Sequence, residues 1–178
     1  MRRLTVALTT AAVLAWAPAG FADDTATPEE VITKVRAAAD YLEQNGKSGL
    51  ETFNKADSPF IWKDAYVFVF DCAAGIADIA HPVASIRNRK VATDKDAAGN
   101  VVGPEMCEAA KRPGGGWVEY KWWKPVKSPN GKIVGYEKKV SRKVSYMLSV
   151  RGQPYEVGAG VYNNTLTVAE LDHLLKKE

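Results

Sequence analysis

The stretch GGGWVEYKWWKP, Gly114 to Pro125, joins three glycines to a strand-like run with three tryptophans, one tyrosine and two lysines. Successive side chains of a strand point to opposite faces, so the run divides into two sets. The two sets are Val118, Tyr120, Trp122 and Lys124 on one face and Trp117, Glu119, Lys121 and Trp123 on the other. The first set predicts a half-apolar pocket wall that ends in a cation. Plain core packing is the alternative for each single aromatic side chain.

The first 22 residues have the features of a secretory signal peptide. Two arginines precede an apolar run over Leu4–Trp16, and small residues lead to Gly20-Phe21-Ala22. The apolar run is short for a membrane-spanning helix, although an uncleaved N-terminal anchor is the alternative. We therefore expect residues 1–22 to be removed and residues 23–178 to form one exported, periplasmic domain without a membrane span.

The positive charge of the chain is local. The whole sequence has 24 Lys and Arg against 21 Asp and Glu, and removal of residues 1–22 lowers the net charge from +3 to +1. Residues 23–110 carry a net charge of −6, whereas residues 111–151 carry +9. Such a field attracts small anions as well as polyanions.

Nucleic-acid platforms also combine aromatic residues with lysine, but export and the low total charge argue against a nucleic-acid partner.

The chain has two cysteines, Cys72 and Cys107. In an exported protein, two cysteines that close a loop of intermediate length are most simply a structural disulfide. Two buried thiols are the alternative. A redox centre is disfavoured because the sequence has no C-x-x-C pair.

Signatures of enzymes are missing from the sequence. It has no G-x-S-x-G, H-E-x-x-H or C-x-x-C-H motif, and the triple glycine lacks the Lys-Ser/Thr of a P-loop. Two distant histidines and two cysteines expected to be bridged make a poor metal site. We therefore expect neither catalysis nor a metal or other cofactor.

The pattern of elements predicts an α+β fold with a mainly antiparallel sheet. Thr27-Pro28-Glu29-Glu30 is typical of a helix start, and apolar residues at helical spacing continue to Asn45-Gly46. Further helices are expected at 48–55, at 104–111 and after Thr167. Strands are expected at 65–71, before His81-Pro82, at 116–124, at 133–150 and at 155–162. The strand at 133–150 is expected to be interrupted near Ser141-Arg142. The polar segment 83–102 has no clear periodicity, as in many binding lids.

Two groups of side chains outside the aromatic strand are candidates for the same pocket. Tyr66 and Phe68 lie on the first long strand, and Lys143 and Tyr146 lie close together on a later one. His81 ends a strand and faces the long polar segment. A lone histidine is usually structural, but its donors also suit a carboxylate ligand.

Six motifs, taken in order, resemble the single Cache domain of the second type over roughly residues 28–165. They are YVFVFD (66–71), AHP (80–82), D-x-x-G (96–99), EMCEAAKRPGGGWVEYKWWKP (105–125), KVSYMLSV (143–150) and EVGAGVY (156–162). The resemblance implies a PAS-like fold, with a long N-terminal helix on one face of a central antiparallel sheet and loops with a short helix on the other. Members of this family typically form extracytoplasmic sensors of chemoreceptors and histidine kinases, and many recognise small organic acids.

Carried over position by position, the resemblance implies a ligand-binding set. It comprises Tyr66, Phe68, His81, Tyr120, Trp122, Lys143 and Tyr146. A cationic lysine with histidine or tyrosine donors can hold a carboxylate, while aromatic walls exclude water and limit ligand size. A Cys72–Cys107 bridge would then fix the short helix over the sheet. The family's usual D-x-D-G-like turn is replaced here by Asp71-Cys72-Ala73-Ala74-Gly75.

The sequence therefore predicts a sensory module that binds a small organic acid. No transmembrane helix or signalling domain follows Tyr162 in this sequence, so we expect a membrane-bound sensor or transporter to read the ligand state. The alternative is a periplasmic protein–protein interaction module without a small-molecule ligand. Trp117 and Trp123 would then be surface contacts.

Overall fold

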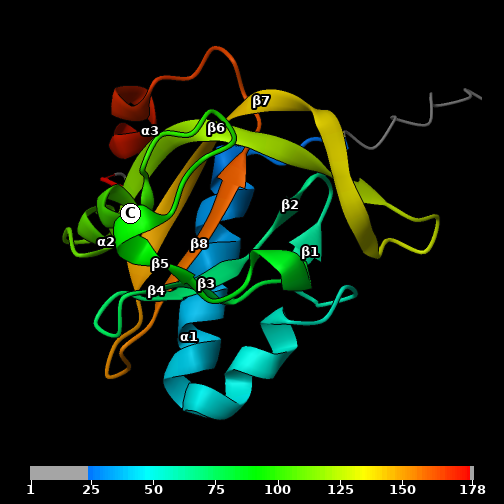
Figure 1. Cartoon of the computed structure of the whole chain (residues 1–178). Helices are drawn as coiled ribbons and strands as arrows, with labels where there is room; N and C mark the ends of the chain where they lie inside the picture. The colour runs from blue at the N-terminus through cyan, green and yellow to red at the C-terminus, as the bar shows by residue number, and fades with distance from the viewer. Residues whose placement is uncertain (1–23, 177–178) are drawn as a thin grey trace, which may run out of the picture.

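A six-stranded antiparallel sheet forms the centre of the computed structural model (Figure 1). Its strands are β3 Phe68–Asp71, β4 Ile76–Ala80, β5 Arg89–Lys90, β6 Gly116–Lys127, β7 Ile133–Ser149 and β8 Glu156–Val161, and a separate hairpin pairs β1 Ile61–Trp62 with β2 Ala65–Tyr66. The order across the sheet is β5-β4-β3-β8-β7-β6, so the late strand β8 is inserted beside the early strand β3. The α+β class and the antiparallel sheet predicted from the sequence are confirmed.

The structure describes residues 24–176. The expected signal peptide, residues 1–22, lies outside the described residues. Within the described part, no helix is both long enough and apolar enough to cross a membrane.

One face of the sheet is covered by helix α1, Pro28–Phe53. Its start follows from a capping box, in which the Thr27 side chain accepts from the Glu30 amide and the Glu30 side chain accepts from the Thr27 amide. Gly46 has φ +51° and interrupts the helical backbone, as the sequence predicted at Asn45-Gly46. The apolar stripe of α1 packs on the inward face of β8, where Val157, Ala159 and Val161 are buried.

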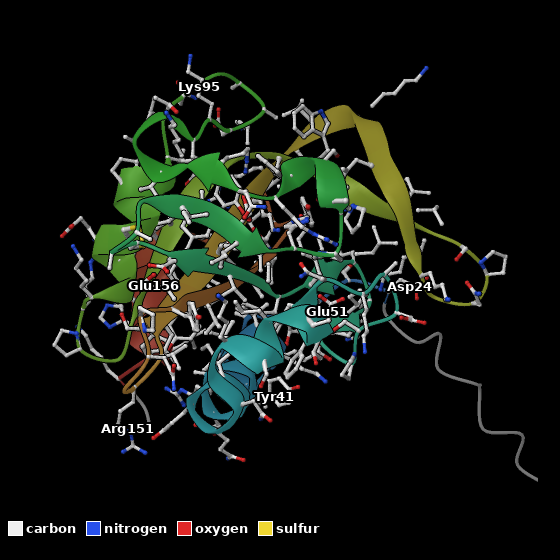
Figure 2. The ribbon with its side chains drawn as sticks, turned by 60° about the horizontal axis from the view of Figure 1, so that its bottom comes forward. Asp24, Tyr41, Glu51, Lys95, Arg151 and Glu156 are labelled. Atoms are coloured by element: carbon white, nitrogen blue, oxygen red, sulfur yellow. A yellow bond between two sulfur atoms is a disulfide. The ribbon has the colours of Figure 1, made fainter. Side chains whose placement is uncertain are left out.

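The other face is covered by helix α2, Gly103–Ala110, and by residues 83–102, here called the lid segment. Figure 2 shows Tyr41 of α1 and Lys95 of the lid segment on opposite sides of the molecule. A disulfide joins Cys72, in the turn after β3, to Cys107 of α2. This bridge fixes α2 over the sheet, as expected.

The lid segment is more ordered than the sequence suggested. It contains two short 3-10 helices, Ala84–Ile86 and Val91–Thr93, and strand β5 between them. The Asp96 carboxylate accepts from the amide of Lys121 on β6, and the Ala97 amide donates to the Lys121 carbonyl. These bonds tie the end of the lid segment to the outer edge of β6, a tertiary contact that periodicity does not reveal.

Strands β6 and β7 form one long hairpin, and the interruption predicted near Ser141-Arg142 is wrong. Ser141 pairs with Trp122 and Arg142 pairs with Lys121, so the ladder continues through both residues. The irregularity lies further out: Trp123 pairs with Val140, but Pro125 pairs with Tyr136. Proline cannot donate to the ladder and favours such a bulge. The outer part of the hairpin, in which β7 no longer pairs with β8, extends past the sheet (Figure 1). Residues 122–142 of this part are called the arm.

The C-terminal helix α3, Val168–Leu174, begins at a second capping box between Thr167 and Glu170. Its buried residue Leu171 joins the core on the α1 side of the sheet. The predicted closing helix is confirmed.

Replacement of the disulfide by the double variant Cys72→Ser/Cys107→Ser should lower the free energy of unfolding by about 2–4 kcal/mol. The bridge closes a loop of 35 residues and restricts the unfolded chain. Urea denaturation of the variant and the oxidised wild type measures the difference. Equal unfolding free energies, or two free thiols in the purified wild type, would contradict this account.

Candidate functional site

A small cavity lies between the sheet and the lid segment. Its walls are Tyr66, Phe68, Phe70, Asp78, His81, Arg89, Asp94, Val102, Met106, Tyr120 and Trp122. The empty space, mouth included, is about 280 Å³, but the centre of a water-sized sphere has only about 20 Å³ in which to move. That is room for one or two water molecules. A larger occupant requires the lid segment or the aromatic walls to move.

The floor of the cavity covers a buried cation. Lys143 lies on β7 and is 0% exposed, and its Nζ has no hydrogen-bond partner among the described residues. The Nζ atom lies 4.3 Å from the ring centre of Tyr66, 5.3 Å from that of Tyr162 and 5.6 Å from that of Phe68. Ring faces stabilise a cation but do not replace its hydration. Burial therefore lowers the pKa of Lys143 to about 7, partly opposed by the charges of Asp78 and Asp64.

Two glycines of β8 leave room for neighbouring side chains on the cavity side of the sheet, and one of them, Gly160, leaves room for Lys143. A Cβ on Gly160 would meet the Ser145 hydroxyl and the Cε atom of Lys143, and a Cβ on Gly158 would meet Phe68. Both glycines face the cavity side of the sheet, while Val157, Ala159 and Val161 face α1. The VGAGV core of the EVGAGVY motif, residues 157–161, therefore alternates apolar side chains on the helix side with glycines on the cavity side.

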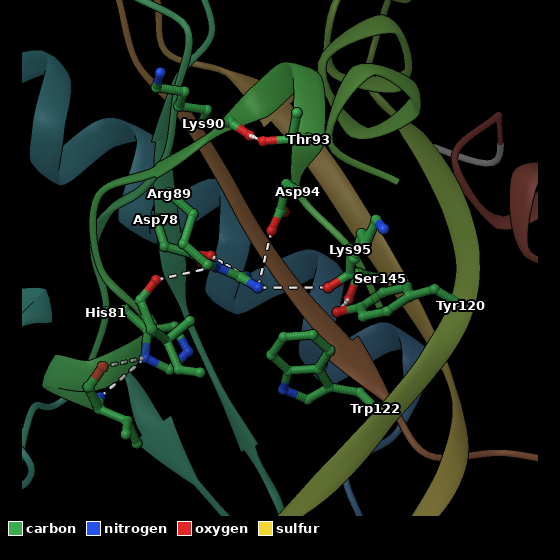
Figure 3. A network of polar contacts seen from close by, with 12 residues as sticks. Asp78, His81, Arg89, Lys90, Thr93, Asp94, Lys95, Tyr120, Trp122 and Ser145 are labelled. Carbon is green, nitrogen blue, oxygen red and sulfur yellow. Dashed lines mark hydrogen bonds and ion pairs between the residues drawn. The ribbon is translucent and has the colours of Figure 1, made fainter. Parts of the chain in front are cut away.

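The roof of the cavity is an ion-paired cluster (Figure 3). The Arg89 guanidinium donates to Asp78 Oδ2 at 2.6 Å, lies 2.9 Å from Asp94 Oδ1 and stacks 5.2 Å from the Trp122 ring centre. Its Nε donates to the Ile86 carbonyl. Because each guanidinium nitrogen already has an acceptor, Arg89 holds the lid segment closed and has little capacity left for a ligand.

Asp78 is positioned by an unusual backbone. Its φ is +52°, a left-handed conformation that costs free energy for a residue other than glycine. The strain aims the carboxyl group at Arg89 from within β4. Burial raises the pKa of Asp78 to about 7, and the neighbouring guanidinium of Arg89 opposes that rise.

A chain of hydrogen bonds links the polar tips of the aromatic walls. His81 Nδ1 accepts from the Val83 amide at 2.9 Å, so the neutral ring carries its proton on Nε2 and donates to the Tyr136 hydroxyl at 3.3 Å. The Tyr136 and Tyr66 hydroxyls are 3.0 Å apart, and Trp122 Nε1 donates to Tyr66 at 3.1 Å. Burial, with a smaller effect of the Lys143 charge, holds the pKa of His81 well below its usual value.

The structure brings together six of the seven predicted ligand-binding residues. Five of them line the cavity, namely Tyr66, Phe68, His81, Tyr120 and Trp122. Lys143 is not itself a lining residue, but its Nζ atom lies behind the lining rings, 4.3 Å from the ring centre of Tyr66. The seventh, Tyr146, is on the opposite face. It packs on Trp117 against α1, with the two rings tilted by 37°, and its hydroxyl donates to the Gly114 carbonyl. Lys143 and Tyr146 are three residues apart, and an odd spacing on a strand puts two side chains on different faces.

Two of the tryptophans also differ from expectation. Trp117 is 2% exposed and belongs to the core beneath α1, so it is not a surface contact. Trp123 was predicted to share that face, but it packs against Trp122 and Tyr136 on the cavity side. The register shift between Trp123 and Pro125 alters the alternation there.

Sequence reasoning missed the apolar wall residues Phe70, Val102 and Met106. It also missed four polar residues of the site, namely Asp78, Arg89, Asp94 and Tyr136. The cluster of cations around Arg87-Asn88-Arg89-Lys90 in an otherwise irregular segment was the available signal for Arg89. Among residues 24–176, no group of His, Cys, Asp and Glu is arranged to hold a metal ion.

Comparison with known proteins identifies the fold. The sequence model of the family described as the Cache domain matches residues 29–167. This chain belongs to the Cache domain family. Cache domains are sensory modules that bind small ligands. The match to the family model extends over nearly all of residues 24–176. No curated protein matches the chain.

Three solved structures are similar to this chain. A periplasmic sensor domain of a chemotaxis protein has a TM-score of 0.54 at 18% identity, covering 77% of this chain and 95% of that one. A Cache chemosensory domain described for its recognition of carboxylic acids has a TM-score of 0.52 at 22% identity, covering 76% and 92%. A methyl-accepting chemotaxis protein from Vibrio parahaemolyticus has a TM-score of 0.49 at 19% identity, covering 74% and 80%. The first two confirm the predicted PAS-like Cache fold.

The variant Gly160→Ala should lower the free energy of unfolding by about 1–3 kcal/mol, because the added methyl group overlaps Ser145 and the stem of Lys143. Gly135→Ala on the arm is the matched control, since nothing lies within 4 Å of its added methyl group. Urea denaturation compares the two variants. Equal effects at the two positions would show that β8 tolerates a side chain under the cavity.

Proposed function

We propose that this chain is an exported Cache sensory module that binds a small carboxylate. The observation that carries the proposal is the Lys143 ammonium, which is fully buried beneath the cavity and has no hydrogen-bond partner in the described chain. A buried cation without an anion is costly, and a bound carboxylate would supply both the charge and the missing acceptors. The carboxylic acid recognition described for a Cache domain of the same fold supports the same ligand class.

The charges around the cavity favour a ligand with one carboxylate. The roof holds two carboxyl groups, Asp78 and Asp94, against the single guanidinium of Arg89. A second carboxylate on the ligand would face this excess of acid, whereas a hydroxyl or carbonyl oxygen could accept from the neutral form of Asp78. The small free volume favours a short chain. We therefore infer a short monocarboxylate.

The ligand state would pass to a membrane-bound partner through the arm. Tyr136 belongs to the arm, and its hydroxyl bonds with Tyr66 and His81 in the cavity wall. The arm carries six Lys or Arg against one acid, Glu137. It also carries Val126, Val134 and Val140, three of the four large apolar side chains that are exposed in the described chain. An acidic, partly apolar surface of a periplasm-facing sensor or transporter fits this composition.

Lys143→Met should weaken the binding of lactate by about 10- to 100-fold, because the charged hydrogen bond to the carboxylate is lost. The same variant should unfold at an equal or higher denaturant concentration, since an apolar side chain of similar shape replaces a buried charge. Calorimetric titration and urea denaturation measure the two effects.

Lys139→Met is the control for this variant, because Lys139 is an exposed cation on the same strand. It should leave the lactate affinity unchanged. Thermal shift of the wild type with lactate, propionate, succinate, amino acids and amines defines the ligand class. A flat panel, or wild-type affinity in Lys143→Met, would refute the carboxylate site.

The affinity for lactate should fall by about 10- to 100-fold between pH 6 and pH 8.5. The free protein loses the proton of Lys143 as the pH rises through about 7, and Asp78 gains its negative charge over the same range. Both changes disfavour an anion, while lactate itself stays ionised. Burial keeps the pKa of His81 well below its usual value, so the His81 ring stays neutral over this range and does not offset the trend. Calorimetric titration with lactate at several pH values tests this pH dependence. A lactate affinity that stays constant from pH 6 to pH 8.5 would contradict Lys143 as the group that binds the carboxylate.

A further inference from the structure

The Lys143 side chain is placed as a nucleophile as well as an anion anchor. Its Nζ atom makes no hydrogen bond within the described chain, and three of the rings around it, Tyr66, Phe68 and Tyr120, also line the cavity. Lysines that are desolvated in apolar pockets retain a large fraction of the neutral amine at neutral pH, and the neutral amine attacks carbonyl groups. Burial lowers the pKa of Lys143 in this sense.

We propose that Lys143 captures short 2-oxo monocarboxylates as a reversible imine with its Nζ atom. This inference rests on the proposed function, since the ligand enters the same cavity, and it names a subclass of acids that the site would retain longest. A 2-oxo acid carries its carbonyl carbon next to the carboxylate. The anion that is drawn to the cation therefore brings the electrophilic carbon to the same nitrogen.

The reaction needs no reagent beyond the ligand and a proton that is returned. The Nζ lone pair forms a bond to the carbonyl carbon, and the π electrons move to the oxygen, which takes up the proton released by the amine. The resulting hydroxyl group then leaves as water when it is protonated, and the nitrogen lone pair forms the C=N bond. The overall change is amine plus ketone to imine plus water, with no oxidation.

The surroundings of Lys143 suit both steps. Asp78 faces the same cavity, is buried, and has a pKa raised to about 7, so it can donate and recover a proton near neutral pH. The closed lid segment limits the access of water, which would hydrolyse the imine. Asp78 and Asp64 are the acidic groups whose charges act on Lys143. Neither forms an ion pair with its Nζ atom in the described chain, so neither blocks the nitrogen.

Reductive trapping tests the proposal. The purified wild-type protein is incubated at pH 7.5 with pyruvate and sodium cyanoborohydride, and tryptic peptides are analysed by mass spectrometry. We expect a reduced pyruvyl adduct at Lys143 that forms at least about tenfold faster than at exposed Lys139, because neutral desolvated amines react preferentially. Excess lactate, which has the same skeleton without the carbonyl group, should protect Lys143. Lys143→Arg should keep a cation at this position and form no adduct there.

The experiments distinguish a failure of the imine from a failure of the carboxylate site. Thermal shifts with both lactate and pyruvate, but no adduct at Lys143, would leave the carboxylate site intact and overturn the imine. Adducts confined to exposed lysines, or no protection by lactate, would overturn it as well. The absence of both a thermal shift and an adduct would refute the proposed function together with the inference.

Discussion

The burial of the Lys143 ammonium on the central strand β7 is the constraint on which the rest of the site depends. Removing an ammonium from water is costly, and here only ring faces and distant carboxylates offset that cost. A side chain at Gly158 of β8 would collide with Met147 and Phe68, and one at Gly160 would collide with Ser145 and the stem of Lys143. An apolar residue at this position would serve stability better. A buried cation at this position is therefore the feature that supports the proposed binding site.

The walls of the cavity come from segments that are far apart in the sequence. Strands β2, β3, β4 and β6 and the lid segment each contribute, and Arg89 closes the roof by bridging Asp78 on β4 to Asp94 of the lid. The Cys72–Cys107 bridge holds α2 beside this cluster. The arm meets the same cavity through Tyr136. Occupation of so small a space must displace at least one of these groups, and this gives a sensory domain a physical link from ligand to surface.

The sequence predicted more of the fold than of the site. Strand alternation placed Tyr120 and Trp122 correctly on one face, because a regular ladder holds there. Tyr146 was assigned to the pocket by the family resemblance, although its odd spacing from Lys143 on a regular strand puts the two side chains on opposite faces. The role of Arg89 could not be predicted, because its partners lie on another strand and in a segment without periodicity. Ion pairs between residues of different segments are determined by tertiary packing. The local pattern of apolar and polar residues carries no information on that packing.

The titration of Lys143 itself tests this account most directly. Nuclear magnetic resonance of protein with isotope-labelled lysine, assigned through Lys143→Arg, follows the side chain from pH 5 to pH 11, with and without saturating lactate. A midpoint near 7 in the free protein, and a higher one when lactate is bound, is the predicted result, because a carboxylate stabilises the charged form. A midpoint near the ordinary value of about 10.4 in the free protein, unchanged by lactate, would contradict a buried anchor for anions.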